Sequence, residues 1–205
     1  MIGFKEFCLL QDPKVKDHWD WRVDVMCEEL EKVAVRKLNG IDKLYDLSIF
    51  SYKHPLLDRV CSELFPAWIW VIDTQNNIGN IMSSQTASNS ISRNILYTLK
   101  YCDMFYGEIS TSRHGYFDNK DGGYMKSLGS SGTVAGLRFD FMIFSDSDIN
   151  CAGSILLSQR YDEWLNQTIC TRVGDNYKSP IVMVGRCNKQ YFPKGWKRPV
   201  KYIEI

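Results

Sequence analysis

The segment "GSSGTVAGLRFDFMIFSDSD", residues 129–148, decides how the fold and the chemistry of this chain are interpreted. It places a turn of small residues before a run of alternating apolar residues, which is typical of a β-strand with one face in the core. The residues expected on that core face are Leu137, Phe139, Phe141 and Ile143. Asp140 projects from the opposite, partly apolar face. Its carboxylate therefore needs a partner, either the nearby Arg138 or a metal ion.

Helical and strand patterns alternate irregularly along the rest of the chain. Apolar residues at steps of three and four predict helices at about 13–38, from Pro55 onward, at about 91–104 and at about 158–173. Aromatic and β-branched runs predict strands at 67–73, 180–186 and 199–205. The uncharged segment 74–92 is predicted to be a long loop or an irregular hairpin. The sequence therefore predicts a single compact α+β domain over residues 1–205, with about four helices packed on a mixed or antiparallel sheet.

Composition and charge exclude several classes of protein. With 205 residues, of which 44% are hydrophobic, the chain is long enough to bury a core. Lys and Arg number 25 against 24 Asp and Glu, so no overall charge draws it to nucleic acid or to an anionic membrane. The longest apolar run, Leu64–Ile72, is shorter than the roughly 20 residues of a membrane helix. We expect no membrane contact.

The cysteines indicate the cellular compartment. There are seven, and none forms a CxxC pair, so a clipped zinc ion is not expected. An odd count also fits a secreted disulfide scaffold poorly. We expect reduced thiols and a cytoplasmic location.

One enzymatic interpretation rests on the opening segment. "GSS" followed by "FDFM" resembles the corresponding stretch of the cyclic GMP-AMP synthase family of nucleotidyltransferases. The resemblance implies that the turn holds a triphosphate while acids hold Mg²⁺ ions, with Asp140 as the matched acid and Glu204 as a further candidate. The phosphate-binding turn would consist of Gly129, Ser130 and Ser131. Arg138 stands where that family has a second acid, so the sequence predicts at best a degenerate site or an inactive relative.

Two further motifs were compared with the end of the same segment. Asp146 and Asp148 have the spacing with which nucleotide-sugar glycosyltransferases hold manganese, but little chain follows them to form an acceptor site. A calcium loop starting at Asp146 would have Cys151 where glycine is needed. No Walker loop, zinc-protease helix or Gly-x-Ser-x-Gly elbow is present. Whether these aspartates bind a metal stays open.

The C-terminal segment carries the other functional signal. Basic residues with interleaved aromatics outnumber acids after Arg172, a combination that favours phosphate contacts and base stacking. The expected contact residues are Lys189, Tyr191, Lys194, Trp196, Lys197, Arg198 and Lys201. The leading hypothesis is a binding or assembly protein without enzymatic activity or cofactor. Its expected partners are further copies of itself, nucleic acid or an acidic protein surface. Both self-association and a viral structural role fit this hypothesis. The nucleotidyltransferase-like site with Mg²⁺ is the alternative.

Overall fold

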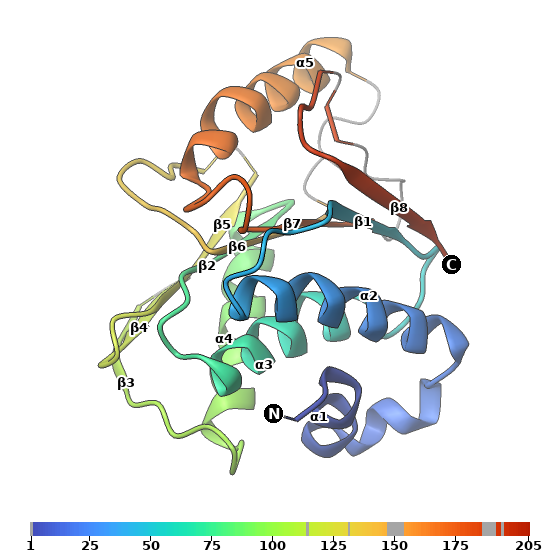
Figure 1. Ribbon diagram of the computed structural model, residues 1–205, viewed down its shortest axis with the longest axis vertical. Helices are drawn as coiled ribbons and strands as arrows, with labels where there is room; N and C mark the ends of the chain where they lie inside the picture. Colours follow the sequence, from blue (N-terminus) through green and yellow to red (C-terminus); the bar gives the residue numbers. More distant parts are fainter. Residues whose placement is uncertain (1, 114, 131, 147–153, 186–191, 194) are drawn as a thin grey trace.

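One mixed sheet of eight strands organises the molecule. The computed structural model describes residues 2–113, 115–130, 132–146, 154–185, 192–193 and 195–205. The strand order is β3-β4-β5-β2-β6-β7-β1-β8 (Figure 1). In that order the strands are Ile109–Arg113, Tyr116–Asn119, Tyr124–Gly129, Ile78–Met82, Phe141–Ser145, Ile181–Gly185, Asp46–Phe50 and Val200–Glu204.

The strands from β5 to β8 in this order are mutually parallel, whereas β4 pairs antiparallel with both of its neighbours, β5 and β3. Helices cover both faces of the parallel part, which is why β6 and β7 are nearly continuous apolar runs. Every residue of β6 and β7 is buried. The segment "FMIFS" therefore has two core faces, where the sequence predicted one.

The helices form one layer on each face of the sheet (Figure 1). The larger layer consists of α1 (Phe4–Gln11), a 3-10 helix (Pro13–His18), α2 (Trp21–Leu38), a π-helix (Arg59–Leu64), α3 (Phe65–Ile72) and α4 (Gln85–Lys100). The other face carries α5 (Ile155–Glu163), which continues as a π-helix (Trp164–Ile169) and a 3-10 helix (Cys170–Arg172). Two hydrophobic clusters fill the space between the sheet and these layers. Within the described residues, no helix has the length and apolar character to span a bilayer.

The predicted α+β class and the predicted strands β7 and β8 are confirmed, with somewhat more helix than expected. The helix predicted over 13–38 is divided at Trp19, because Asp20 caps the start of α2 by accepting a hydrogen bond from the Arg22 backbone N–H at 2.9 Å. The helix predicted over 158–173 begins earlier, at Ile155.

The prediction of a strand at 67–73 is wrong, because most of this segment forms α3. Trp68 and Trp70 are both fully buried and donate their indole N–H groups to the backbone oxygens of Ile2 and Asn76, at 3.0 and 2.8 Å. A short helix that is buried on all sides has no apolar period by which sequence reasoning can distinguish it from a buried strand.

The predicted loop or irregular hairpin over 74–92 is also wrong, because this segment contains β2 and the start of α4. β2 is completely buried although it includes Gly79 and Asn80. A Cβ atom at Gly79 would lie 3.1 Å from the Phe139 ring, and the side-chain NH2 of Asn80 donates to the Ser62 carbonyl at 2.8 Å. Tertiary contacts thus explain why Gly79 and Asn80 lie in a strand, although both residues locally favour a loop.

Candidate functional site

The chain leaves neighbouring parallel strands toward opposite faces of the sheet. After β1 and β2 it enters helices of the layer that contains α2, α3 and α4, whereas after β6 it passes to α5 on the other face (Figure 1). Where such connections diverge, an open parallel sheet forms a crevice outside the carboxyl ends of its strands, and ligands bind there. The fold therefore predicts a ligand site at the carboxyl ends of β1, β2, β6 and β7.

Polar side chains are buried at this edge. Ser51 follows β1 and is completely buried, and Ser145 and Asp146 at the end of β6 are 1% and 7% exposed. The Ser51 hydroxyl and Asn80 Oδ1 have no hydrogen-bond partner among the described residues. A buried polar atom without a partner costs free energy, so unpaired atoms at a crevice favour a site that a ligand or water completes.

Backbone strain falls at the same edge. In the described part of the chain, the non-glycine residues with positive φ are Lys53 (49°) and Asp146 (44°). Lys53 lies in the loop after β1, and Asp146 directly follows β6. The left-handed region is unfavourable for most residues with a side chain, and such strain clusters at binding and catalytic sites.

A π-helix before α3 lies beside the carboxyl end of β6. Ser62 lies in this helix, and its hydroxyl forms a hydrogen bond with the hydroxyl of Ser145. The Asn80 amide donates to the Ser62 carbonyl. The wider turn of a π-helix is uncommon and often marks a functional site. Here Ser62 joins the π-helix to the middle of β2, at Asn80, and to the carboxyl end of β6, at Ser145.

His54 fixes the loop between β1 and the π-helix. It is 3% exposed; its Nδ1 accepts from the backbone N–H of Leu56 at 3.3 Å, and its Nε2 lies 3.5 Å from a carboxylate oxygen of Asp20. Burial, with the nearby Arg22 guanidinium, lowers the pKa of His54, so the neutral imidazole predominates at neutral pH. His54 thus anchors the loop to the start of α2.

The outer side of this loop carries a basic and an aromatic side chain. Tyr52 is 62% exposed, and Lys53 Nζ lies 4.9 Å from the centre of its ring. Lys53 is exposed as well. The carboxyl ends of the strands and the loop after β1 therefore combine buried oxygen atoms and the Asp146 carboxylate with the accessible lysine Lys53.

Asp140, the acid of the sequence-based site, lies elsewhere. It precedes β6 at the amino end of the strand, where it pairs with Lys37 Nζ at 2.9 Å and accepts from the Asn77 backbone N–H at 3.0 Å. Its partner is therefore a lysine of α2, and the expected pairing with Arg138 is not found. α2 approaches this point only in the folded chain, so sequence spacing gave no sign of it.

The expected phosphate turn is at the other end of the sheet from Asp140. Gly129 is the last residue of β5 and pairs with Met82, and the Ser130 N–H donates to the Met82 carbonyl at 2.7 Å. A Cβ atom at Gly129 would lie 2.8 Å from the Gln85 nitrogen, so this glycine permits close packing on α4. Ser131 lies outside the described residues. The structure does not bring this turn and Asp140 together.

Glu204, the further candidate acid, ends β8 beside Phe50 and so also lies at the opposite edge from Asp140. Searching the described residues reveals no group of three or more His, Cys, Asp or Glu side chains that could hold a metal ion.

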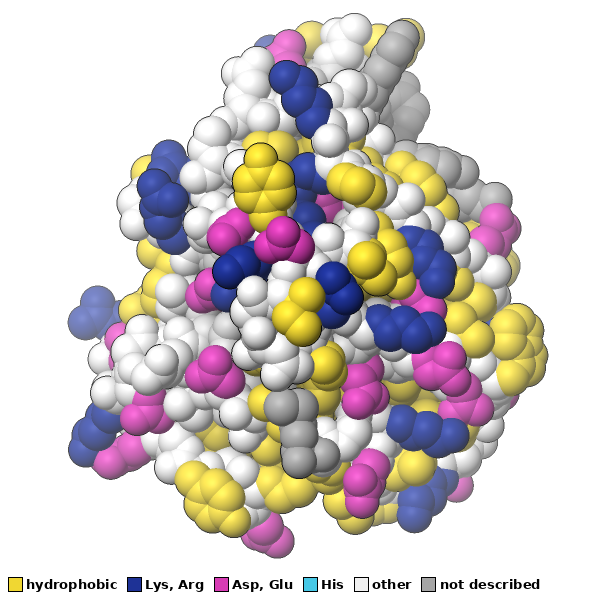
Figure 2. All heavy atoms as spheres, viewed as in Figure 1, with side chains coloured by type: hydrophobic (Ala, Val, Ile, Leu, Met, Phe, Trp, Pro, Cys, Tyr) yellow, Lys and Arg dark blue, Asp and Glu magenta, His cyan; other side chains and the backbone are white. Residues whose placement is uncertain are grey.

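The C-terminal contact residues are divided by the fold. Arg198 and Trp196 turn inward and donate to Asp46, at 2.7 and 3.2 Å, and Lys201 pairs with Glu29 at 2.7 Å. Lys197 is exposed. Lys189, Tyr191 and Lys194 lie outside the described residues. Figure 2 shows basic and acidic side chains interspersed on one face, without a continuous field of one sign.

No protein-family model and no curated protein matches this chain. Among solved structures, it is similar to the large terminase from the thermophilic bacteriophage D6E, determined in complex with ADP, with a TM-score of 0.45 and 14% sequence identity. The similarity covers 85% of this chain and 44% of that protein, so the chain spans less than half the length of this neighbour.

Sequence reasoning missed most of the residues at the carboxyl edge. Asp146 was considered as a metal ligand, but Ser51, Ser62 and Asn80 were not considered. The available signal was the position of Ser51 and Asp146, each of which directly follows an apolar strand.

Proposed function

We propose that this protein binds a nucleoside triphosphate with its magnesium ion in the crevice at the carboxyl edge. One observation carries the proposal. The chain passes from β1 through a strained loop into a helix at a switch point of a parallel sheet, and an aspartate follows a nearby strand of the same sheet. P-loop nucleoside triphosphatases have this arrangement: a strand, loop and helix hold the phosphates, and an aspartate outside the loop helps to hold the magnesium ion.

The residues present fit such a ligand in part. Magnesium prefers carboxylate and hydroxyl oxygens, which Asp146 and Ser51 supply, and Lys53 would provide a cation for the phosphates. The base would lie beside Tyr52, which is exposed and free to stack.

The loop departs from the sequence of catalytic P-loops. Those loops need glycines for close backbone approach and a lysine followed by serine or threonine, but this loop reads Ser-Tyr-Lys-His-Pro-Leu-Leu over residues 51–57. We therefore propose binding with little or no hydrolysis, in keeping with a protein that acts by binding or assembly.

The test is titration of the protein with a fluorescent ATP analogue in the presence and absence of Mg²⁺. Asp146→Asn should weaken magnesium-dependent binding about tenfold or more, and Lys53→Ala about threefold, because each removes a charged contact. Phosphate release should stay at the background rate.

Two matched controls are available on the same chain. Lys100 and Tyr101 form another exposed pair, with Nζ 5.3 Å from the ring centre, so Lys100→Ala should leave binding unchanged. Asp103 is exposed and serves as the control for Asp146. Absence of binding at millimolar nucleotide, or equal losses in Asp103→Asn and Asp146→Asn, would refute the proposal.

A further inference from the structure

A second polar cluster lies at the opposite edge of the sheet, where β1, β7 and β8 begin. Its centre is Asp46, which is completely buried. Asp46 Oδ1 accepts hydrogen bonds from Lys43 Nζ at 2.9 Å, from Arg198 Nη2 at 2.7 Å and from the Ile181 N–H at 2.9 Å. Its Oδ2 accepts from the Trp196 indole at 3.2 Å. The carboxylate thus joins three segments of the chain, which contain Lys43 and Asp46, Ile181, and Trp196 with Arg198.

Positive charge exceeds negative charge in this cluster. The Lys43 and Arg198 side chains are only 4% and 11% exposed, yet they share the single carboxylate of Asp46. Burial raises the pKa of Asp46 to about 7 and lowers the pKa of Arg198 to about 10. Arg198 therefore stays cationic at neutral pH, and the buried cluster keeps at least one uncompensated positive charge.

Arg198 also retains unused hydrogen-bond donors. Its Nη2 donates to Asp46 and to the Ser179 carbonyl at 2.6 Å, but its Nε and Nη1 are buried and have no acceptor within the described ranges. Unsatisfied donors on a buried cation are more costly than those on a neutral group. The excess charge and these unused donors together favour an anionic ligand.

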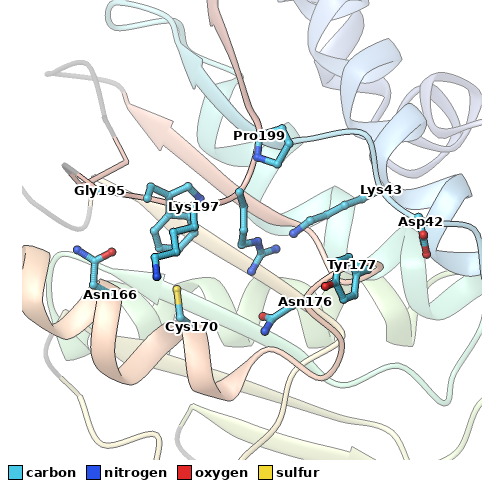
Figure 3. A pocket seen from close by; sticks show the side chains of 11 residues that line it. Asp42, Lys43, Asn166, Cys170, Asn176, Tyr177, Gly195, Lys197 and Pro199 are labelled. Atoms are coloured by element: carbon cyan, nitrogen blue, oxygen red, sulfur yellow. The ribbon is translucent and has the colours of Figure 1, made fainter.

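A cavity of about 760 Å³ opens beside this cluster. This volume is within the roughly 300–1,000 Å³ of small-molecule sites. Figure 3 shows Lys43, Cys170 and Lys197 extending toward the same hollow from different segments. Trp196 and Tyr177 add aromatic surface to the lining, and Asp42 lies at the rim beyond Lys43 (Figure 3).

We propose that this cavity binds a phosphate monoester, with its phosphate against Lys43, Lys197 and Arg198 and its organic part beside Trp196 and Tyr177. The three cations Lys43, Lys197 and Arg198 outnumber the two acids of the cluster and its lining, Asp46 and Asp42. A phosphate monoester can accept from all three cations through its three terminal oxygens, whereas a carboxylate has only two oxygens. Guanidinium and ammonium groups are the usual phosphate partners in proteins. Inorganic phosphate, a nucleoside monophosphate and the 5′ end of a nucleic acid share this chemistry.

Cys170 provides a direct reporter of occupancy. It lines the cavity and is partly buried, whereas the other four cysteines within the described ranges are buried. Alkylation of Cys170 by iodoacetamide, followed by peptide mass mapping, measures access to the cavity separately from every other thiol.

The experiment compares alkylation of the full chain with inorganic phosphate, AMP, and a short oligonucleotide with either a 5′-phosphate or a 5′-hydroxyl. We expect at least one phosphate-bearing probe to slow alkylation of Cys170 about tenfold at saturation. Stronger protection by AMP than by inorganic phosphate assigns a small-molecule ligand. Protection by the phosphorylated oligonucleotide alone assigns a nucleic-acid end. Both outcomes support the site.

Variants distinguish this site from the carboxyl edge. Lys197→Ala, at an exposed position that should not disturb folding, should raise the concentration needed for half-protection about threefold or more, whereas Lys16→Ala and Asp146→Asn should not change it. Arg198→Gln should abolish protection, with circular dichroism to verify folding. Failure of every phosphate probe to protect, equal protection by the 5′-hydroxyl oligonucleotide, or unchanged protection in Lys197→Ala would overturn the proposal.

Discussion

The two edges of the parallel sheet bury different kinds of polar group. At the carboxyl edge, hydroxyl and amide groups are buried together with strained backbone, and Asp146 is the acid that follows β6. At the amino edge, Asp46 is buried between Lys43 and Arg198, and the charges compensate one another only in part. The carboxyl edge has buried polar atoms without a partner among the described residues, whereas the amino edge has more positive than negative charge.

The difference follows from how each edge is formed. At the carboxyl edge, β1 and the π-helix after it are close in sequence, but the Ser62–Ser145 hydroxyl pair joins residues 83 positions apart. The amino edge brings Asp46 to Arg198 across 152 positions. Both edges therefore depend on the whole fold, and the amino edge depends in addition on the attraction between buried charges.

The largest expected effect concerns the pH dependence of stability at the amino edge. Burial raises the pKa of Asp46 from 3.8 to about 7, so the folded protein keeps a proton that the unfolded chain has already released. The contribution of Asp46 to stability should therefore be greatest below pH 4 and decline as the pH rises to 7, by up to about 4 kcal/mol. Urea unfolding from pH 4 to pH 8 measures this decline. Asp46→Asn should remove most of it, and an unchanged decline in that variant would contradict the assignment.

A smaller effect should appear when the hydroxyl pair at the carboxyl edge is broken. Ser62→Ala leaves the Ser145 hydroxyl buried without its partner, and should lower the free energy of unfolding by about 2 kcal/mol. Removing both hydroxyls with Ser145→Ala should cost less than the sum of the single changes, since no unpaired group remains. Additive losses in urea denaturation would show that the two hydroxyls act independently.

The smallest effect tests whether the edges bind their ligands independently. At ten times its dissociation constant a ligand stabilises the folded state by about 1.4 kcal/mol. Mg²⁺ with ATP should give this stabilisation in the wild type and in Lys197→Ala, but not in Asp146→Asn. A phosphate monoester that binds only at the amino edge should stabilise the wild type and Asp146→Asn equally, and Lys197→Ala by only about 0.9 kcal/mol if its affinity falls threefold. Loss of both responses in either variant would mean that the two sites are one.

Sequence reasoning was most successful where local pattern and burial agree. The strands β7 and β8 are apolar or β-branched runs bounded by turn residues, and their positions were predicted closely. It failed in 67–92, where a helix was predicted as a strand, and a strand and the start of a helix as a loop. In α3 both faces are buried, and in β2 the side-chain NH2 of an asparagine donates to a carbonyl 18 positions away. Neither condition can be detected in a local window.

The same division applies to the candidate sites. By itself the sequence determined the α+β class, an aspartate directly after the strand that became β6, and a basic and aromatic C-terminal segment, because each depends on neighbouring residues. Only the tertiary structure decided that Asp140 pairs with Lys37, that Trp196 and Arg198 turn inward to Asp46, and that Ser62 meets Ser145. These contacts join segments far apart in the chain. Burial strengthens the electrostatic attraction and the hydrogen bonds between these partners, but only after the sheet has brought them together.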